Sequence, residues 1–480
     1  MIFAFLMTRL SIPEVMGLET ELGIQSSLKD DSMETKGIVT DLSKIAFRNR
    51  TEIELSDPDF WLTNGGRIYF DQGLWEICTP EVRNIKDLLT WQRAMERIIV
   101  NAASTNPNLT VYKNNLDSGE YSTIDHENTW GSHMNYTTIL GLSRRVSLIL
   151  PAVLEKLLCG SGNLKNSGRF DIAQRARKIG CIHPEIACLT HPEATITENR
   201  VNLLDERNER SQGRLFHHTS NDSNMLDLAE WLKVGFMRNM IALAERNSLP
   251  SIDYICEEAL HDLVHLTTIP NIEQDPKTTL NNWYLPSMSV ENRSALALLR
   301  RYNTRAREVL FGIDSETNYT IDLTDEVISS LERFGEEPAL LYGTLDWVTK
   351  RLLLTEKMKA EGLSPDNDQV RSVNLEYHSL KRDSLFNDLN LYGGINRITS
   401  EEEVRRAMIE PPNNSRAHVR GKIVGKAVAM LRRNLEQVDW EELSYRNELG
   451  NLTTMNLYDA RENYSEELPA WLSEINALKT

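Results

Sequence analysis

The segment NGGRIYFDQGLWEICTPE (64–81) places an arginine, a phenol and a carboxylate on one face of a predicted strand. Side chains alternate along a strand, so Arg67, Tyr69 and Asp71 share one face and apolar residues occupy the other. Buried charges cost several kcal/mol unless they are paired or bind something. The pattern therefore predicts a face that holds a charged ligand.

Four glutamates accompany this face in the sequence. Glu76 and Glu81 follow in the same segment. Glu19 and Glu21 lie two residues apart in VMGLETELGI (15–24), a predicted strand on which both side chains point the same way. One such pair alone is more often solvent-facing. Carboxylates repeated on neighbouring strands instead favour Mg²⁺ or Mn²⁺, because hard cations select oxygen ligands.

Carboxylates, metal and an arginine that can bind phosphate with two hydrogen bonds together indicate a nucleoside triphosphate site for metal-assisted phosphoryl transfer. The sequence contains neither a G-x-x-x-x-G-K-[ST] loop nor a G-x-G-x-x-G motif before a helix. We therefore expect metal ions on a sheet to hold the phosphates, as in glutamine synthetase-type ligases. His133 lies on a predicted strand near these acids, where a structural role and an active-site role are equally compatible with the pattern.

The elements that must position these residues form an α+β pattern. An antiparallel-rich sheet comes mostly from the first half of the chain, with helices packed over one face. Further strands are predicted at 109–115 and 130–139, with two more within 199–221. Predicted helices cover 87–103, 143–162, 225–247, 252–263, 289–311, 324–334, 337–361 and 369–382. After the Gly-Gly of NLYGGINRITSEEEV, a Ser N-cap and an acidic first turn predict a small C-terminal domain over 401–480, leaving 1–400 as the large domain.

Composition places the chain among ordinary globular proteins, with 480 residues, 40% apolar and 26% charged. A net charge of −17 argues against a general nucleic-acid binder, which needs a basic surface. Five scattered cysteines indicate reduced thiols and a cytoplasmic protein. The apolar start, MIFAFLMTRL, is too short to span a membrane and lacks a cleavable signal pattern, so we expect no membrane association.

A series of motifs, in order along the chain, resembles the family of Pup ligases and Pup deamidases (depupylases), relatives of glutamine synthetase. They are MGLETELG, NGGRIYFD, YKNNLDSG, GSHMNY, NDSNM followed by LKVG, LDWVTKR, LEYHSLKR, PPNNSRAHVRG and VDWEEL, from about residue 15 to 445. The resemblance implies a glutamine synthetase-like large domain and a small C-terminal domain that closes over the nucleotide. It also implies that ATP and Mg²⁺ are used to join the C-terminal glutamate side chain of Pup, a small disordered modifier, to lysines of target proteins.

The resemblance assigns roles residue by residue. Glu19 and Glu76 match metal-binding glutamates, Tyr69 matches a tyrosine at the metal site, and Asp71 matches the catalytic aspartate. Glu21, on the face of Glu19, joins the expected metal ligands. The expected ATP contacts are Arg67, Thr79, Trp440 and either Arg207 or Arg214. GSHMNY carries Met134 where the family usually has glutamate, so one acidic group is missing there.

The direction of the reaction has two interpretations. NDSNM, LDWVTKR, YHSLKR and SRAHVRG resemble the ligase branch. The 39 residues between Ile24 and Asn64 also leave no room for the long extra loop of the deamidase branch. The Asp71-to-Glu76 spacing and CTPE resemble the deamidase branch instead. We favour the ligase and keep the hydrolase as the alternative. A catalytically inactive binding relative is a third possibility, disfavoured because Glu19, Arg67, Asp71 and Glu76 all occur together.

Overall fold

The computed structural model describes residues 13–26, 31–48, 58–71, 74–116, 129–140, 142–179, 214–254, 258–279, 283–429, 435–446, 451–464 and 466–477. The statements below concern these residues. For Asp71 and Arg214 the description covers the position in a strand and not the side chain. Arg207 and the segment 181–191, which contains two cysteines and two histidines, lie outside the described residues.

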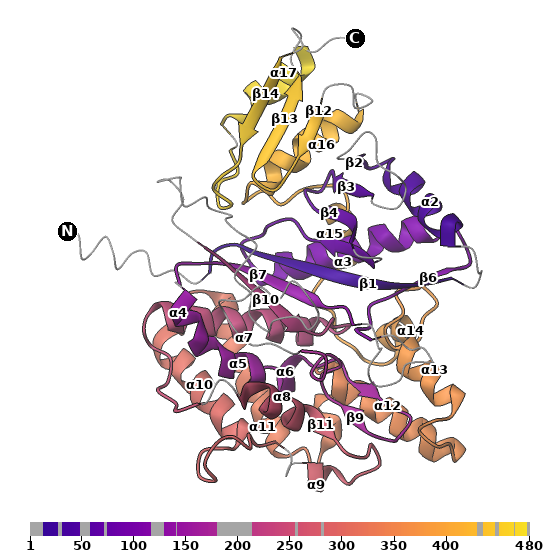
Figure 1. Ribbon diagram of the computed structural model, residues 1–480, viewed down its shortest axis with the longest axis vertical. Helices are drawn as coiled ribbons and strands as arrows, with labels where there is room; N and C mark the ends of the chain where they lie inside the picture. Colours follow the sequence, from indigo (N-terminus) through magenta and orange to yellow (C-terminus); the bar gives the residue numbers. More distant parts are fainter. Residues whose placement is uncertain are drawn as a thin grey trace, which may run out of the picture.

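An eight-stranded antiparallel sheet forms the centre of the fold (Figure 1). Seven strands follow the order β10-β7-β1-β5-β4-β3-β2, and β6 pairs with the far end of β1. Their bounds are β1 Met16–Ser26, β2 Ala46–Arg48, β3 Asp59–Leu62, β4 Arg67–Asp71, β5 Leu74–Cys78, β6 Leu109–Tyr112, β7 Ser132–Thr138 and β10 Arg214–Asn221. The strands predicted at 15–24, 66–71, 109–115 and 130–139 are therefore confirmed. Of the two strands predicted within 199–221, β10 is one, and residues 199–213 lie outside the described part.

Two long helices cover one face of this sheet. In α3 (Ile85–Ala103) the Asn84 side chain caps the first turn, accepting a hydrogen bond from the Asp87 amide at 2.7 Å. The buried stripe of α3, which includes Met95 and Ile99, packs on the apolar side chains of β1, β4 and β5. Helix α7 (Asp227–Glu245) is buried almost all round and packs against β7. The charged and polar side chains that alternate with these apolar residues along β1, β4 and β5 therefore lie on the opposite face of the sheet.

Further helices build a second layer beyond α7 (Figure 1). They are α8 Ala259–Thr267, α9 Pro276–Thr279, α10 Ala295–Leu310, α11 Ser315–Glu332, η4 Pro338–Leu341, α12 Asp346–Glu361 and α13 Asp368–Glu376. Helix α2 Asp31–Leu42 instead lies beside α3, and α14 Leu385–Tyr392 contributes to a smaller apolar cluster with Tyr377. A small sheet, in the order β11-β9-β8, combines β8 Asn163–Leu164, β9 Phe170–Asp171 and β11 Thr268–Ile269.

The single helix predicted at 143–162 is wrong. The segment divides into α4 Leu142–Arg145, η1 Val146–Leu148, α5 Ile149–Leu154 and α6 Lys156–Cys159. Because Pro151 has no amide hydrogen, it is tolerated only in a first helical turn, and the break before Ile149 places it there.

Helix α11 begins nine residues before its predicted start at 324. Its buried face is lined by threonines, including Thr317, Thr320 and Thr324, rather than by apolar residues alone, so its first half lacks the expected periodicity. Asp314 caps it by accepting a hydrogen bond from the Thr317 amide at 2.6 Å.

The C-terminal part contains α15 Glu401–Ala407, α16 Ala417–Ala429, α17 Leu468–Ala477 and a three-stranded sheet of β12 Leu435–Val438, β13 Glu442–Arg446 and β14 Leu452–Asn456. The predicted Ser N-cap at the start of α15 is confirmed, and Ser400 and Glu403 together form a capping box there. The buried residues of α15 belong to the main core. From Val419 onward the apolar residues form a separate cluster that also includes Phe47 of β2 and Trp61 of β3. The domain boundary at residue 400 stays a prediction.

No helix among the described residues is long and apolar enough to cross a lipid bilayer.

Candidate active site

Cross-strand pairing sets two rows of chemically active side chains on the sheet face opposite α3. Residues paired across neighbouring strands point to the same face. One row runs from β7 to β3 as His133, Glu19, Cys78, Arg67 and Trp61, and the other from β1 to β3 as Glu21, Glu76, Tyr69 and Asp59. The predicted sharing of one face by Glu19, Glu21, Glu76, Arg67 and Tyr69 is therefore confirmed at the level of strand register.

Two groups of side chains have the spacing of metal ligands, and both include Glu19. One group is Glu19, Glu76 and Cys78, and the other is Glu19, His133 and His217; in each, the candidate ligand atoms lie within 4.8 Å of one another. Asn135 donates a hydrogen bond to Glu19 at 3.0 Å, and its side-chain oxygen lies 2.7 Å from Nδ1 of His217. These bonds fix the orientation of Glu19.

The carboxylates raise one another's proton affinity in the absence of a bound cation. Burial, and then the charges of Glu19 and Glu21, raise the pKa of Glu76 to about 8, although His133 and a hydrogen bond from Tyr69 oppose the shift. Burial acts to lower the pKa of His133, but Glu19, Glu21 and Glu76 outweigh it and raise that pKa overall. This excess of buried negative charge, on oxygen donors, fits a divalent cation such as Mg²⁺.

Glu21 lies at the edge of this cluster and is partly exposed. The Gly131 amide donates a short hydrogen bond, 2.5 Å, to one of its carboxylate oxygens. The buried guanidinium of Arg175 packs against Gly131, so closely that a side-chain carbon added at Gly131 would collide with it. Glu21 is thus positioned for a role beside Glu76.

Arg67 forms an ion pair with Asp59 that the sequence does not predict. Its Nε and Nη2 donate to the two carboxylate oxygens of Asp59 at 2.8 and 3.0 Å, a bidentate geometry. Its guanidinium also lies over the rings of Tyr69 and Trp61, with 4.4 and 5.3 Å to their centroids. Asp59 and the two aromatic rings therefore fix the orientation of the Arg67 guanidinium.

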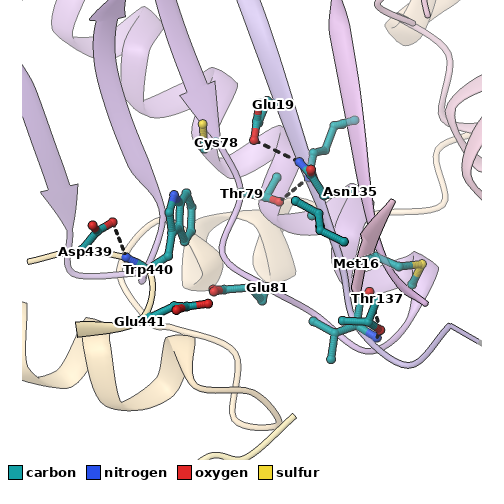
Figure 2. Close-up of a pocket in the computed structure, with 14 residues that line it drawn as sticks. Met16, Glu19, Cys78, Thr79, Glu81, Asn135, Thr137, Asp439, Trp440 and Glu441 are labelled. Atoms are coloured by element: carbon teal, nitrogen blue, oxygen red, sulfur yellow. Dashed lines mark hydrogen bonds between the residues drawn. The ribbon is translucent and has the colours of Figure 1, made fainter. Parts of the chain in front are cut away.

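A pocket opens beside this cluster and is closed on its far side by the loop between β12 and β13 (Figure 2). Trp440 and Glu441 of that loop face Glu19, Cys78 and Thr79 across the pocket. Thr79 is fixed at the end of β5, because its hydroxyl accepts a hydrogen bond from the Leu18 amide at 3.0 Å. The pocket therefore has a carboxylate end at Glu19 and an aromatic end at Trp440.

The sequence groups Glu81 with the carboxylates that favour a metal ion, but in the structure Glu81 pairs with two arginines. It receives hydrogen bonds from the buried guanidinium groups of Arg416, at 2.8 Å, and Arg420. Burial acts to raise the pKa of Glu81, but these two arginines outweigh it and lower the pKa. Glu81 therefore links the C-terminal part of the chain to the end of β5.

The strand register also places three further residues singled out in the sequence. Met134 is buried in the core, on the face opposite its neighbours His133 and Asn135, so the glutamate that the family carries at this position would not face the carboxylate cluster here. Arg214 occupies the first position of β10, paired with Thr138. Asp71 is the last residue of β4, paired with Leu74.

Asn135, His217 and Cys78 belong to this site but were not among the predicted site residues. Asn135 follows His133 by the period of two, so alternation along β7 is sufficient to find it. His217 is found only when β10 is known to pair with β7. Cys78 lies on the same alternation as Glu76 and was assigned to the general set of reduced thiols.

The antiparallel sheet covered by helices is a glutamine synthetase-like α+β fold, which confirms the expected fold class, and its exposed face carries a pocket lined by carboxylates. A family model described as Pup-ligase protein matches residues 14–444. The chain therefore belongs to the Pup-ligase protein family, as the motifs indicate.

Curated relatives include both branches of the family. A depupylase of Acidothermus cellulolyticus is 30% identical over 394 residues, covering 78% of this chain and 74% of the relative. A Pup–protein ligase of Acidimicrobium ferrooxidans is 27% identical over 483 residues, covering 96% and 98%. The Pup–protein ligase of Mycobacterium leprae is 26% identical over 453 residues, covering 89% and 92%.

Solved structures with the same fold include the Pup ligase PafA in complex with Pup, with a TM-score of 0.77, 20% identity, and coverage of 96% of this chain and 92% of that one. PafA in complex with ADP gives a TM-score of 0.74 and 20% identity, with coverage of 95% and 96%.

Proposed function

We propose that the chain is an ATP- and Mg²⁺-dependent ligase that joins the side-chain carboxylate of the C-terminal glutamate of Pup, or a similar modifier, to lysines of target proteins. The observation that carries this proposal is the pocket lined by both Glu19 and Trp440, beside which Glu76 forms a ligand-like group with Glu19. The near-complete coverage of a Pup–protein ligase, and the fold shared with PafA bound to Pup and to ADP, support it.

Glu19 and Glu76, with Glu21 at the edge of the cluster, would hold Mg²⁺, and Tyr69 would orient Glu76 through its hydrogen bond. Bound Mg²⁺ would offset the negative charge of the transferring phosphoryl group. Arg67, oriented by Asp59, would direct its remaining N–H donors to phosphate oxygens. Arg214 stays a proposed phosphate contact on the strength of the resemblance.

Trp440 would pack against the nucleotide base, and Thr79 would donate its hydroxyl hydrogen to the nucleotide. In the first step, the modifier's γ-carboxylate attacks the terminal phosphorus of ATP, giving an acyl phosphate and ADP. In the second step, a substrate lysine attacks the acyl carbon, an isopeptide bond forms and inorganic phosphate leaves. A lysine ammonium of pKa about 10.4 must first lose a proton, and Asp71 is the proposed base.

The depupylase direction is the second candidate, favoured by the 30% identity to the Acidothermus enzyme. The CTPE motif and the spacing from Asp71 to Glu76 also favour it. In that case Asp71 would activate water or attack the isopeptide carbonyl, and the nucleotide would complete the site without being consumed. The short segment between Ile24 and Asn64 and the coverage of the ligases favour ligation.

Nucleotide stoichiometry separates the two directions, because condensing a carboxylate with an amine in water is uphill and hydrolysis is downhill. The purified protein is incubated with Mg²⁺, ATP, a Glu-terminated modifier and a lysine-bearing protein. Ligation predicts one ADP released per conjugate, and no conjugate when ADP plus phosphate replaces ATP. Cleavage of purified conjugate with ADP and phosphate, together with no conjugate from ATP, would show that the depupylase assignment is correct. Asp71→Asn should silence either activity.

A further inference from the structure

Cys78 occupies a place in the site that an oxygen-only magnesium centre does not require. It lies on β5 between Glu19 of β1 and Arg67 of β4 in one cross-strand row, and it lines the pocket. The residue is 2% exposed, and its Sγ lies 4.0 Å from Oε1 of Glu76. The thiol therefore faces the carboxylates rather than the apolar core.

The spacing of the three side chains fits one cation. Sγ of Cys78 and carboxylate oxygens of Glu19 and Glu76 all lie within 4.8 Å of one another. Ligand bonds of about 2.0–2.3 Å bring two ligand atoms to separations of up to about 4.6 Å around one ion. An ion can thus touch the sulfur and both oxygens with small side-chain movements.

The donor atoms differ in what they select. Mg²⁺ binds oxygen and gains little from sulfur, whereas Zn²⁺, Co²⁺ and Cd²⁺ bind thiolate strongly. The imidazoles of His133 and His217 form a second ligand group with the same Glu19, and imidazole also suits these softer ions. Nε2 of His133 is buried and has no hydrogen-bond partner among the described residues, so this ring nitrogen is available to bind a ligand.

We propose that Cys78 makes the Glu19–Glu76 position bind thiophilic divalent cations of the Zn²⁺ class more tightly than Mg²⁺, so that such ions occupy the site and block the Mg²⁺-dependent reaction. The inference rests on the proposed function, because it assigns an ion preference to the same metal position. On binding, the Cys78 thiol loses its proton to solvent and the thiolate becomes a ligand.

Co²⁺ is the probe, because a cobalt–thiolate bond gives an intense near-ultraviolet charge-transfer absorption that oxygen and nitrogen ligands do not give. The full-length protein, stripped of metal and kept reduced with a phosphine, is titrated with Co²⁺. The band should saturate at one equivalent, disappear in Cys78→Ser and persist in Cys159→Ser, which removes another buried thiol. Zn²⁺ should abolish it at stoichiometric amounts, and a hundredfold excess of Mg²⁺ should leave it in place.

A second variant keeps the thiol and changes its neighbour. Glu76→Gln should weaken Co²⁺ binding at least tenfold, and this result stands even if Cys78→Ser fails to fold by circular dichroism. Absence of the band in the wild-type protein, its survival in folded Cys78→Ser, unchanged affinity in Glu76→Gln, or displacement by Mg²⁺ would each overturn the proposal.

Inhibition links the ion preference to the reaction. In metal-controlled buffer, Zn²⁺ should inhibit Mg²⁺-ATP-driven conjugation by the wild type at a concentration at least tenfold lower than for Cys78→Ser, each normalised to its own activity with Mg²⁺. Equal sensitivity would contradict the proposal. The cobalt band needs neither ATP nor Pup, so a missing conjugate with an intact band would reject the ligase function and leave the ion assignment standing.

Discussion

The indole of Trp440 stands edge-on to the indole of Trp61, with ring centroids 4.7 Å apart and an interplanar angle of 76°. The guanidinium of Arg420 lies 4.8 Å from the first ring and 5.0 Å from the second. Arg420 also donates a hydrogen bond of 3.1 Å to the Trp440 carbonyl. The aromatic wall of the pocket is therefore set by packing against β3 before a ligand binds, which reduces the entropy lost on binding.

Removing this wall should weaken nucleotide binding. We expect Trp440→Ala to cost about 1–3 kcal/mol of Mg²⁺-ATP binding free energy, the range for stacking of a base on an aromatic side chain. Calorimetric titration measures the loss. Trp440→Phe should restore most of it, and Trp471→Ala, an aromatic deletion in the same C-terminal cluster but outside the pocket, should leave the affinity within twofold. An unchanged affinity in Trp440→Ala would remove Trp440 from the site.

The Glu81 carboxylate should matter far more to stability than an exposed one. Glu81→Ala removes the carboxylate that Arg416 and Arg420 share in the buried interior and leaves, among the described residues, only Glu441, 3.7 Å from Arg416, so we expect a loss of about 3–5 kcal/mol in the free energy of unfolding. Glu308→Gln, which removes an exposed pair with Arg305, should cost less than about 1 kcal/mol. Urea unfolding compares the two, and a similar cost for both would contradict the buried clamp.

The metal-free protein should lose stability as pH rises across the titration of Glu76. Its pKa rises from 4.5 to about 8 on folding, so the folded state favours the protonated form. That contribution is fully present below the unfolded pKa and disappears as pH rises through the folded pKa. Thermal melting in EDTA should therefore show Tm falling between about pH 4.5 and 8, a slope that Glu76→Gln should flatten and saturating Mg²⁺ should cancel.

Replacing a helical glycine by alanine should lower the free energy of unfolding at one position and raise it at another. At Gly235 of α7, an added methyl would lie 2.4 Å from Oγ1 of Thr320, a core contact, so we expect a loss of about 1–3 kcal/mol. At Gly425 of α16 the nearest atom would be 3.8 Å away, and the higher helix propensity of alanine should stabilise the fold by about 0.5–1 kcal/mol. Denaturant midpoints of the two single variants decide this, and destabilisation by both would contradict the packing at Gly425.

The alternation of β1, β4 and β5 could be predicted because it is local. Period-two spacing places Glu19, Arg67 and Glu76 on one face, and the strand register confirms that face. The partners that define their chemistry are not local. The sequence predicts Arg67 as a phosphate contact, but it does not predict that Asp59 orients it, because that pairing depends on the turn between β3 and β4.

Glu81 shows more clearly that the sequence does not predict the partner of a carboxylate. In sequence it follows Glu76 within the same motif, and both glutamates are counted there among the acids that favour a metal ion. The arginines that neutralise it are 335 and 339 residues further along, and no nearby residue signals them. The sequence can therefore place a carboxylate on a face, but which cation it meets follows from the tertiary fold.

The apolar cluster shared by Phe47, Trp61 and the residues from Val419 onward also has a consequence for biosynthesis. The ribosome completes β2 and β3 hundreds of residues before it makes the segment that covers them. During that interval two large aromatic side chains at the edge of the nascent sheet remain open to non-native association. We expect this edge to be where molecular chaperones engage the growing polypeptide, and docking of α16 to be among the last steps of folding.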